Sequence, residues 1–173
     1  MNKKEQGFTL MELLAVVIII ALMAAVGTGY YKRAVEQARF PEGLMAASAI
    51  AEGVNREYKR SLLEEAEPIK QPKLKTLDIS IAKNGSCTTS SDYCIKTKYF
   101  EMNVNGQGVV NAYRGTTSSY KYYIQIKPSF AMVDRGQVFC YGKSSSGVKF
   151  KGKEFCQSLG YTSCTSAGAC RKP

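Results

Sequence analysis

The chain has 173 residues, which is enough for one ordinary domain or two small ones. It contains no histidine, and this excludes catalytic triads built on histidine and the usual histidine metal sites. Its 24 Lys and Arg against 14 Asp and Glu give a net charge of +10, which suits an anionic partner but is equally typical of a solvated basic surface.

The N-terminus combines a short basic segment with a long apolar one. Lys3 and Lys4 carry the basic charges, which we expect to stay in the cytoplasm. Residues 8–26 are apolar except for Thr9 and Glu12. About 20 helical residues span a bilayer core, whereas the apolar part of a cleaved secretory signal has roughly 7–15. The pattern therefore predicts a membrane-spanning helix.

Glu12 is the unusual residue of this helix, because a carboxylate inside a membrane needs a partner. Its position near the start of the apolar run would let it reach the lipid headgroups unaided. Alternatively, cleavage before Phe8 would place an α-amino group at the membrane edge. Glu12 of one copy could then bind the amine of the next in a row of staggered parallel helices, which would neutralise both charges and set the register of assembly.

The sequence Gly-Phe-Thr-Leu-Met-Glu at residues 7–12, with the apolar run behind it, closely resembles the class III signal of type IV pilins and pseudopilins. The resemblance implies that residues 1–7 are a leader, that a prepilin peptidase cuts after Gly7, and that the new terminus at Phe8 is methylated. It also implies that Glu12 docks new subunits into a filament. The likeness is strong through about residue 60 and weak beyond it.

The helical pattern continues beyond the apolar run. We expect a transmembrane or filament-core helix over residues 8–29 and an amphipathic helix over 30–63. A domain of this size cannot bury a helix about 80 Å long, so its first half must lie in a membrane or in a bundle of its own copies. Apolar side chains three and four positions apart define the buried face of the second half: Phe40, Leu44, Ala47, Ala51, Val54, Tyr58 and Leu62.

Residues 64–95 form a connecting loop, and residues 96–141 alternate polar and apolar side chains as strands do. The turn sequence Asn-Gly-Gln-Gly at 105–108 predicts a hairpin, residues 120–126 predict a third strand, and 130–133 with 138–141 predict a second hairpin. We therefore predict an α+β fold that resembles the type IV pilins: a long N-terminal helix packed on an antiparallel sheet of about four strands, with a disulfide-rich C-terminal loop.

The cysteines all lie in the second half of the chain, and none forms a C-x-x-C pair. Without histidine, this pattern does not predict a zinc site. An even number confined to one half indicates disulfides formed outside the cytosol. The spacing favours disulfides between cysteines that are neighbours in the sequence: Cys87–Cys94, Cys140–Cys156 and Cys164–Cys170. The Cys140–Cys156 bond would tie the C-terminal region, residues 142–173, to the sheet.

The C-terminal region is also basic and carries a few aromatic residues, which could contact DNA or a surface through phosphate binding and stacking. Charge runs are more often solvated faces. The basic residues are Lys143, Lys149, Lys151, Lys153, Arg171 and Lys172, with Tyr141, Phe150 and Phe155 nearby.

Together these features predict a structural subunit rather than an enzyme, without cofactor or metal. By the resemblance, it is a pilin precursor held in the bacterial inner membrane and later polymerised into a type IV pilus at the cell surface. Its partners would be copies of itself, a prepilin peptidase and the inner-membrane assembly machinery. One alternative is a pseudopilin of type II secretion; a more distant one is a membrane-anchored binding module that never polymerises.

Overall fold

The computed structural model describes residues 9–64, 67, 71–88, 92–143, 151–165 and 168–173. The chain divides into two compact units, residues 1–38 and 39–173. One helix, α1 (Leu10–Leu63), contributes to both units and continues without interruption through Pro41. All the strands and the short helix α2 (Gly152–Ser158) belong to the second unit.

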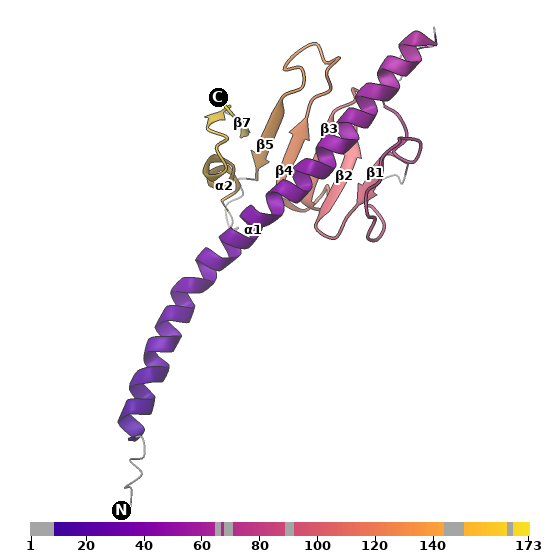
Figure 1. Cartoon of the computed structure of the whole chain (residues 1–173). Coiled ribbons are helices and arrows are strands. Elements are labelled where there is room, and N and C mark those ends of the chain that lie inside the picture. The colour runs from indigo at the N-terminus through magenta and orange to yellow at the C-terminus, as the bar shows by residue number, and fades with distance from the viewer. Residues whose placement is uncertain (1–8, 65–66, 68–70, 89–91, 144–150, 166–167) are drawn as a thin grey trace, which may run out of the picture. The chain divides into compact units, whose positions relative to one another are not determined.

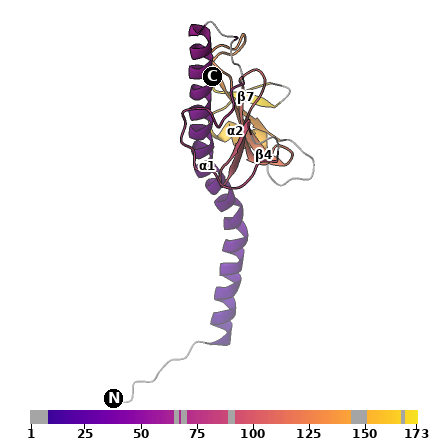
Figure 2. The same ribbon diagram turned by 90° about the vertical axis from the view of Figure 1, so that its right-hand side faces the viewer.

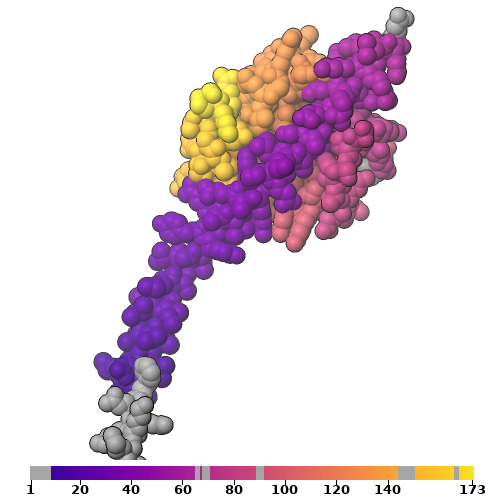
Figure 3. All heavy atoms as spheres, in the orientation of Figure 1, coloured from indigo at the N-terminus to yellow at the C-terminus, as the bar shows by residue number. Residues whose placement is uncertain are grey.

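In the second unit, the C-terminal half of α1 lies along one face of an antiparallel sheet (Figures 1 and 2). This confirms the predicted α+β fold. Space-filling atoms show the helix covering the middle of that face, with sheet residues visible on either side (Figure 3). The predicted apolar stripe packs into the core, although Leu62 near the end of the helix is 49% exposed. The buried helix residues are Phe40, Ala47, Ile50, Ala51 and Val54.

The sheet has seven strands rather than the predicted four, in the order β1-β2-β3-β4-β5-β7-β6, and every neighbouring pair is antiparallel. The three additional strands have two or three residues each, which is too short for a period-two pattern to be visible in the sequence. The strands are β1 (Cys94–Lys96), β2 (Phe100–Val104), β3 (Val110–Gly115), β4 (Tyr120–Ile126), β5 (Val138–Gly142), β6 (Ser163–Cys164) and β7 (Ala169–Arg171).

The β2–β3 hairpin is closed by the predicted turn. The side-chain oxygen of Asn105 accepts hydrogen bonds of 3.0 Å from the backbone N–H groups of Gln107 and Val109. Gly108 has φ +77°, a left-handed conformation that glycine adopts without steric cost. Local turn chemistry therefore sets the register of the two strands that the turn joins.

The predicted strand at residues 130–133 is wrong, because this segment lies in the loop between β4 and β5. Its predicted partner, 138–141, lies in β5, and both positions beside β5 are already taken, by β4 and β7, so the segment has no strand to pair with. It is held to α1 instead: Phe130 stacks on Tyr58 at 3.9 Å, and Ser129 donates two hydrogen bonds of 3.0 Å to Asn55. Met132 at the loop tip is 96% exposed.

Gly43 marks the place where the α1 backbone comes closest to the sheet. A Cβ atom at this position would lie 2.6 Å from the ring of Phe100, which is itself only 1% exposed. We expect Gly43→Ala to lower the free energy of unfolding by about 1–3 kcal/mol, since the ring has no free space to move into. Denaturant unfolding of the full chain in detergent measures this loss. Gly27→Ala is the matched control, because a Cβ there meets nothing within 4 Å; equal effects of the two substitutions would contradict the close-approach explanation.

Candidate functional site

Reciprocal hydrogen bonds between Thr9 and Glu12 cap the N-terminus of α1. The backbone N–H and the hydroxyl of Thr9 each donate to Oε2 of Glu12 at 2.9 Å, and the Glu12 N–H donates back to the Thr9 hydroxyl at 3.3 Å. This arrangement is a capping box, in which two backbone donors that no helical turn can satisfy find side-chain acceptors. The Glu12 side chain is therefore oriented by contacts within its own chain.

The capping box was not anticipated from the sequence, which led us to consider only lipid headgroups or a cation as partners of Glu12. The signal was present, because Thr followed three residues later by Glu at the start of an apolar run is the pattern of this cap. The predicted processing residues, Gly7 and Phe8, and the leader lysines, Lys3 and Lys4, lie outside the described residues.

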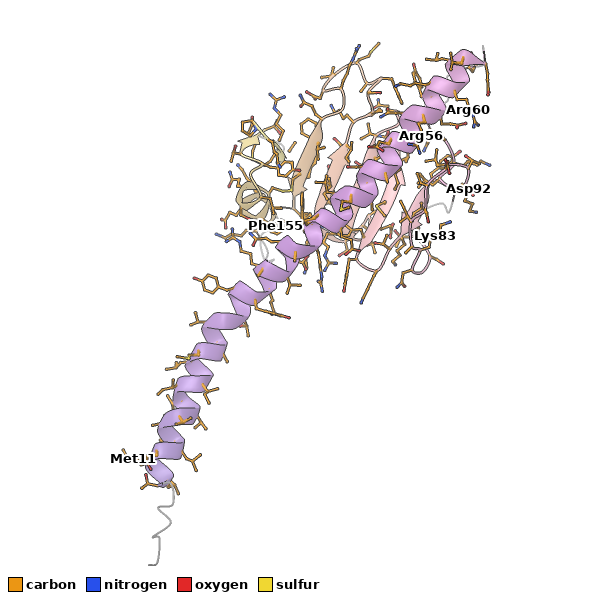
Figure 4. The ribbon with its side chains drawn as sticks, viewed as in Figure 1. Met11, Arg56, Arg60, Lys83, Asp92 and Phe155 are labelled. Atoms are coloured by element: carbon orange, nitrogen blue, oxygen red, sulfur yellow. A yellow bond between two sulfur atoms is a disulfide. The ribbon has the colours of Figure 1, made fainter. Side chains whose placement is uncertain are left out.

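Beyond the cap, α1 presents an uninterrupted apolar surface. Every residue from 10 to 34 is exposed, and this part of the helix is long and apolar enough to cross a membrane by length and composition. Figure 4 shows the side chains of this segment, from Met11 onward, projecting around the helix. Such a helix requires an apolar surround, which a bilayer or other copies of the same helix can supply.

An aromatic and basic segment follows the apolar run. Tyr30 and Tyr31 are 76% and 71% exposed, and the next residues are Lys32 and Arg33. Tyrosine and long basic side chains are typical of the membrane–water interface, where an apolar body and a polar tip are both accommodated. The segment is therefore placed where a helix leaving a membrane would carry its interfacial anchors.

All six cysteines are paired, and the partners follow one another along the chain. Cys140 on β5 and Cys156 on α2 are fully buried, and their bond fastens the short helix to the sheet. The other bonds close short loops: Cys87–Cys94 at the start of β1, and Cys164–Cys170 between β6 and β7. Within the C-terminal region, disulfides thus fasten α2 to the sheet and link β6 to β7.

Of the aromatic residues proposed to accompany the basic C-terminal residues, one is buried and cannot take part. Phe155 is 3% exposed and stacks on Tyr122 at 4.6 Å, so it cannot stack on a ligand. Figure 4 shows it on α2, beside the helix α1. Lys151 pairs with Glu154 at 2.8 Å. Lys149 and Phe150 lie outside the described residues. Within the part of the chain that is described, no cluster of three potential metal-ligating side chains occurs.

Comparison with known proteins identifies the N-terminal segment alone. A family model described as the prokaryotic N-terminal methylation motif matches residues 2–28. No curated protein and no solved structure matches the chain. The motif is the type IV prepilin signature, and it indicates a pilin-like or pseudopilin precursor that is anchored in the membrane and processed by a prepilin peptidase.

Proposed function

We propose that this chain, which carries the type IV prepilin signature, is a pilin precursor that polymerises into a type IV pilus. Cleavage after Gly7 and methylation of Phe8 would produce the mature subunit. The observation that carries the proposal is the methylation motif over residues 2–28 leading directly into an exposed apolar helix. Other proteins of this kind are generally structural rather than enzymatic.

Polymerisation follows from the two properties of α1. Its exposed apolar side chains each gain about 1.5–3 kcal/mol when they leave water, and within a membrane tight packing between copies of the helix supplies the attraction instead, so the copies can form a stable bundle. The carboxylate of Glu12, held in place by Thr9, is positioned to bind the α-amino group of Phe8 in a neighbouring copy. One oxygen, Oε2, accepts the capping bonds, and Oε1 is left to accept from the neighbour.

The proposal assigns the chain three partners: further copies of itself, a prepilin peptidase and the inner-membrane machinery that extracts subunits during assembly. The precursor would reside in the bacterial inner membrane with residues 1–7 in the cytoplasm, and the polymer would extend from the cell surface. Disulfide bonds suit this location, because they persist in oxidising compartments and protect an exposed domain.

A pseudopilin of a type II secretion system is the second candidate, since the methylation motif and the apolar helix fit either class. The two differ in the product: an extended pilus is released when cells are sheared, whereas a pseudopilus stays within the envelope. A membrane-anchored module that keeps its leader and remains a monomer is the third candidate.

Mass spectrometry of the intact protein from membranes and from sheared cell surfaces tests these candidates together. We expect a chain that begins at Phe8, carries one methyl group on its terminus and lacks the six hydrogens removed by three disulfides. Recovery of this species in the sheared fraction supports a pilus. Its confinement to the membrane fraction favours the pseudopilin, and a chain that still begins at Met1 overturns processing and polymerisation alike.

A further inference from the structure

The face of the sheet that points away from α1 carries a row of tyrosines. Tyr113, Tyr123 and Tyr141 occupy directly opposed positions on β3, β4 and β5. Their strand neighbours Ala112, Ile124 and Cys140 point into the core on the other face. We call these three residues the tyrosine row; Tyr120 lies beside it, with its ring centroid 5.3 Å from those of both Tyr113 and Tyr123.

The rings of the tyrosine row pack against one another. Tyr123 and Tyr141 are stacked with their centroids 4.4 Å apart and an interplanar angle of 5°, and Tyr113 lies 5.0 Å from Tyr123 on its other side. The central ring therefore has a neighbour on both sides, and each residue of the row remains partly exposed. What the row offers to a partner is the rims of its rings, with their hydroxyl groups, rather than open ring faces.

A second row, made of amides, runs parallel to the tyrosines and holds the hydroxyl of Tyr141. Asn111 donates to Asn103 at 3.2 Å, Gln125 donates to Asn111 at 3.0 Å, and the Tyr141 hydroxyl donates to Gln125 at 3.1 Å. This chain of hydrogen bonds crosses the four strands β2 to β5 and leaves few alternative rotamers on that face. A preorganised surface of this kind loses little conformational entropy when it binds.

The strands that form this face belong to a part of the chain with a strong positive charge. Residues 96–173 contain twelve Lys or Arg and three Asp or Glu. Each of the three acids is already buried or paired: Glu101 is 0% exposed, Asp134 contacts Lys127 at 2.8 Å, and Glu154 pairs with Lys151, the residue just before α2. Lys143 is exposed and lies over the ring of Tyr120, with Nζ 5.3 Å from its centroid. A partner for this face should therefore be an anion.

The packing of the row decides which kind of anion is favoured. A single-stranded nucleic acid binds to such surfaces mainly by stacking its bases on open aromatic faces, and the central ring here has none. Burial raises the pKa of Tyr123 above the usual value, so its phenol stays protonated and can donate a hydrogen bond. Phenol hydroxyls beside an ammonium group match a polymer that carries both hydroxyls and carboxylates.

We propose that the tyrosine row, together with Lys143, is a binding surface for an acidic polysaccharide. The Lys143 ammonium would bind a uronate carboxylate, and the phenol hydroxyls of Tyr113 and Tyr123 would bind sugar hydroxyls of a polymer that runs across the strands. The proposal concerns the second unit alone and does not depend on polymerisation of the chain.

Binding of the full chain in detergent to immobilised polygalacturonate tests this inference, with a thymidine oligonucleotide and uncharged dextran as competitors of different chemistry. We expect Lys143→Ala and Tyr123→Phe each to weaken polygalacturonate binding by about three- to tenfold, the effect of one hydrogen bond or ion pair. Tyr123→Phe keeps the stacked ring, so the fold is preserved. The matched controls on α1, Lys59→Ala and Tyr58→Phe, should change binding by less than about twofold.

Three results would overturn the proposal. The oligonucleotide could bind as tightly as polygalacturonate at about 0.15 M salt, which would indicate a general polyanion surface. Dextran could compete as well as the uronate polymer, which would remove the role of charge. Finally, the row variants could behave like their α1 controls, which would place any binding elsewhere on the molecule.

Discussion

Replacing Glu12 by glutamine is expected to reduce filament yield by about a hundredfold or more, while insertion into the membrane and cleavage of the leader continue. The substitution keeps the size of the side chain but leaves the α-amino group of the neighbouring copy without a counter-charge in an apolar surround. Breaking a buried ion pair in this way costs about 3–5 kcal/mol. Filament yield in the sheared fraction, measured against the membrane pool of the same cells, gives the effect.

The capping box makes glutamine more informative than alanine at this position. Glutamine can still accept the hydrogen bonds from Thr9, so Glu12→Gln removes the charge and retains the cap, whereas Glu12→Ala removes both. Normal filaments from Glu12→Gln, with none from Glu12→Ala, would mean that Glu12 acts only as a helix cap. Glu52→Gln is the matched control, because Glu52 is an exposed carboxylate on the second half of the same helix.

Removal of the Cys140–Cys156 disulfide should lower the free energy of unfolding by about 2–5 kcal/mol. The bond joins two fully buried sulfurs across a sequence separation of 16, and it holds α2 where Phe155 packs on Tyr122. The double substitution of both cysteines to alanine avoids a reactive free thiol. Denaturant unfolding of the oxidised full chain in detergent, compared with the unsubstituted chain, measures the loss.

The bond between Cys164 and Cys170 provides the comparison. It closes a loop with a sequence separation of only 6, and it links two strands at the margin of the sheet. Its removal should destabilise the chain less, because a shorter loop restricts the unfolded chain less and fewer core contacts depend on it. If the two double variants lose the same stability, the Cys140–Cys156 bond is not what secures α2.

The N-terminal segment could be predicted from the sequence because its properties are local. The length and hydrophobicity of residues 8–26 determine how the helix partitions between water and an apolar phase, whatever the rest of the chain does. The turn at 105–108 is equally local, since one asparagine side chain and a glycine with positive φ close it. The cap at Thr9 and Glu12 belongs to the same class, and its spacing alone would have predicted it.

The remaining features of the fold depend on contacts between residues that are far apart in the sequence. The apolar segment at 130–133 looks like a strand, yet it forms a loop because β4 and β7 already flank β5, its predicted partner. Strands β6 and β7 are too short to be recognised alone; their pairing with each other and with β5, and the Cys164–Cys170 bond, hold them in place. The tyrosine row exists only through the register of three strands. The sequence thus determined what each segment prefers by itself, and the tertiary structure decided which segments are neighbours, because strand pairing depends on partners far away in the chain.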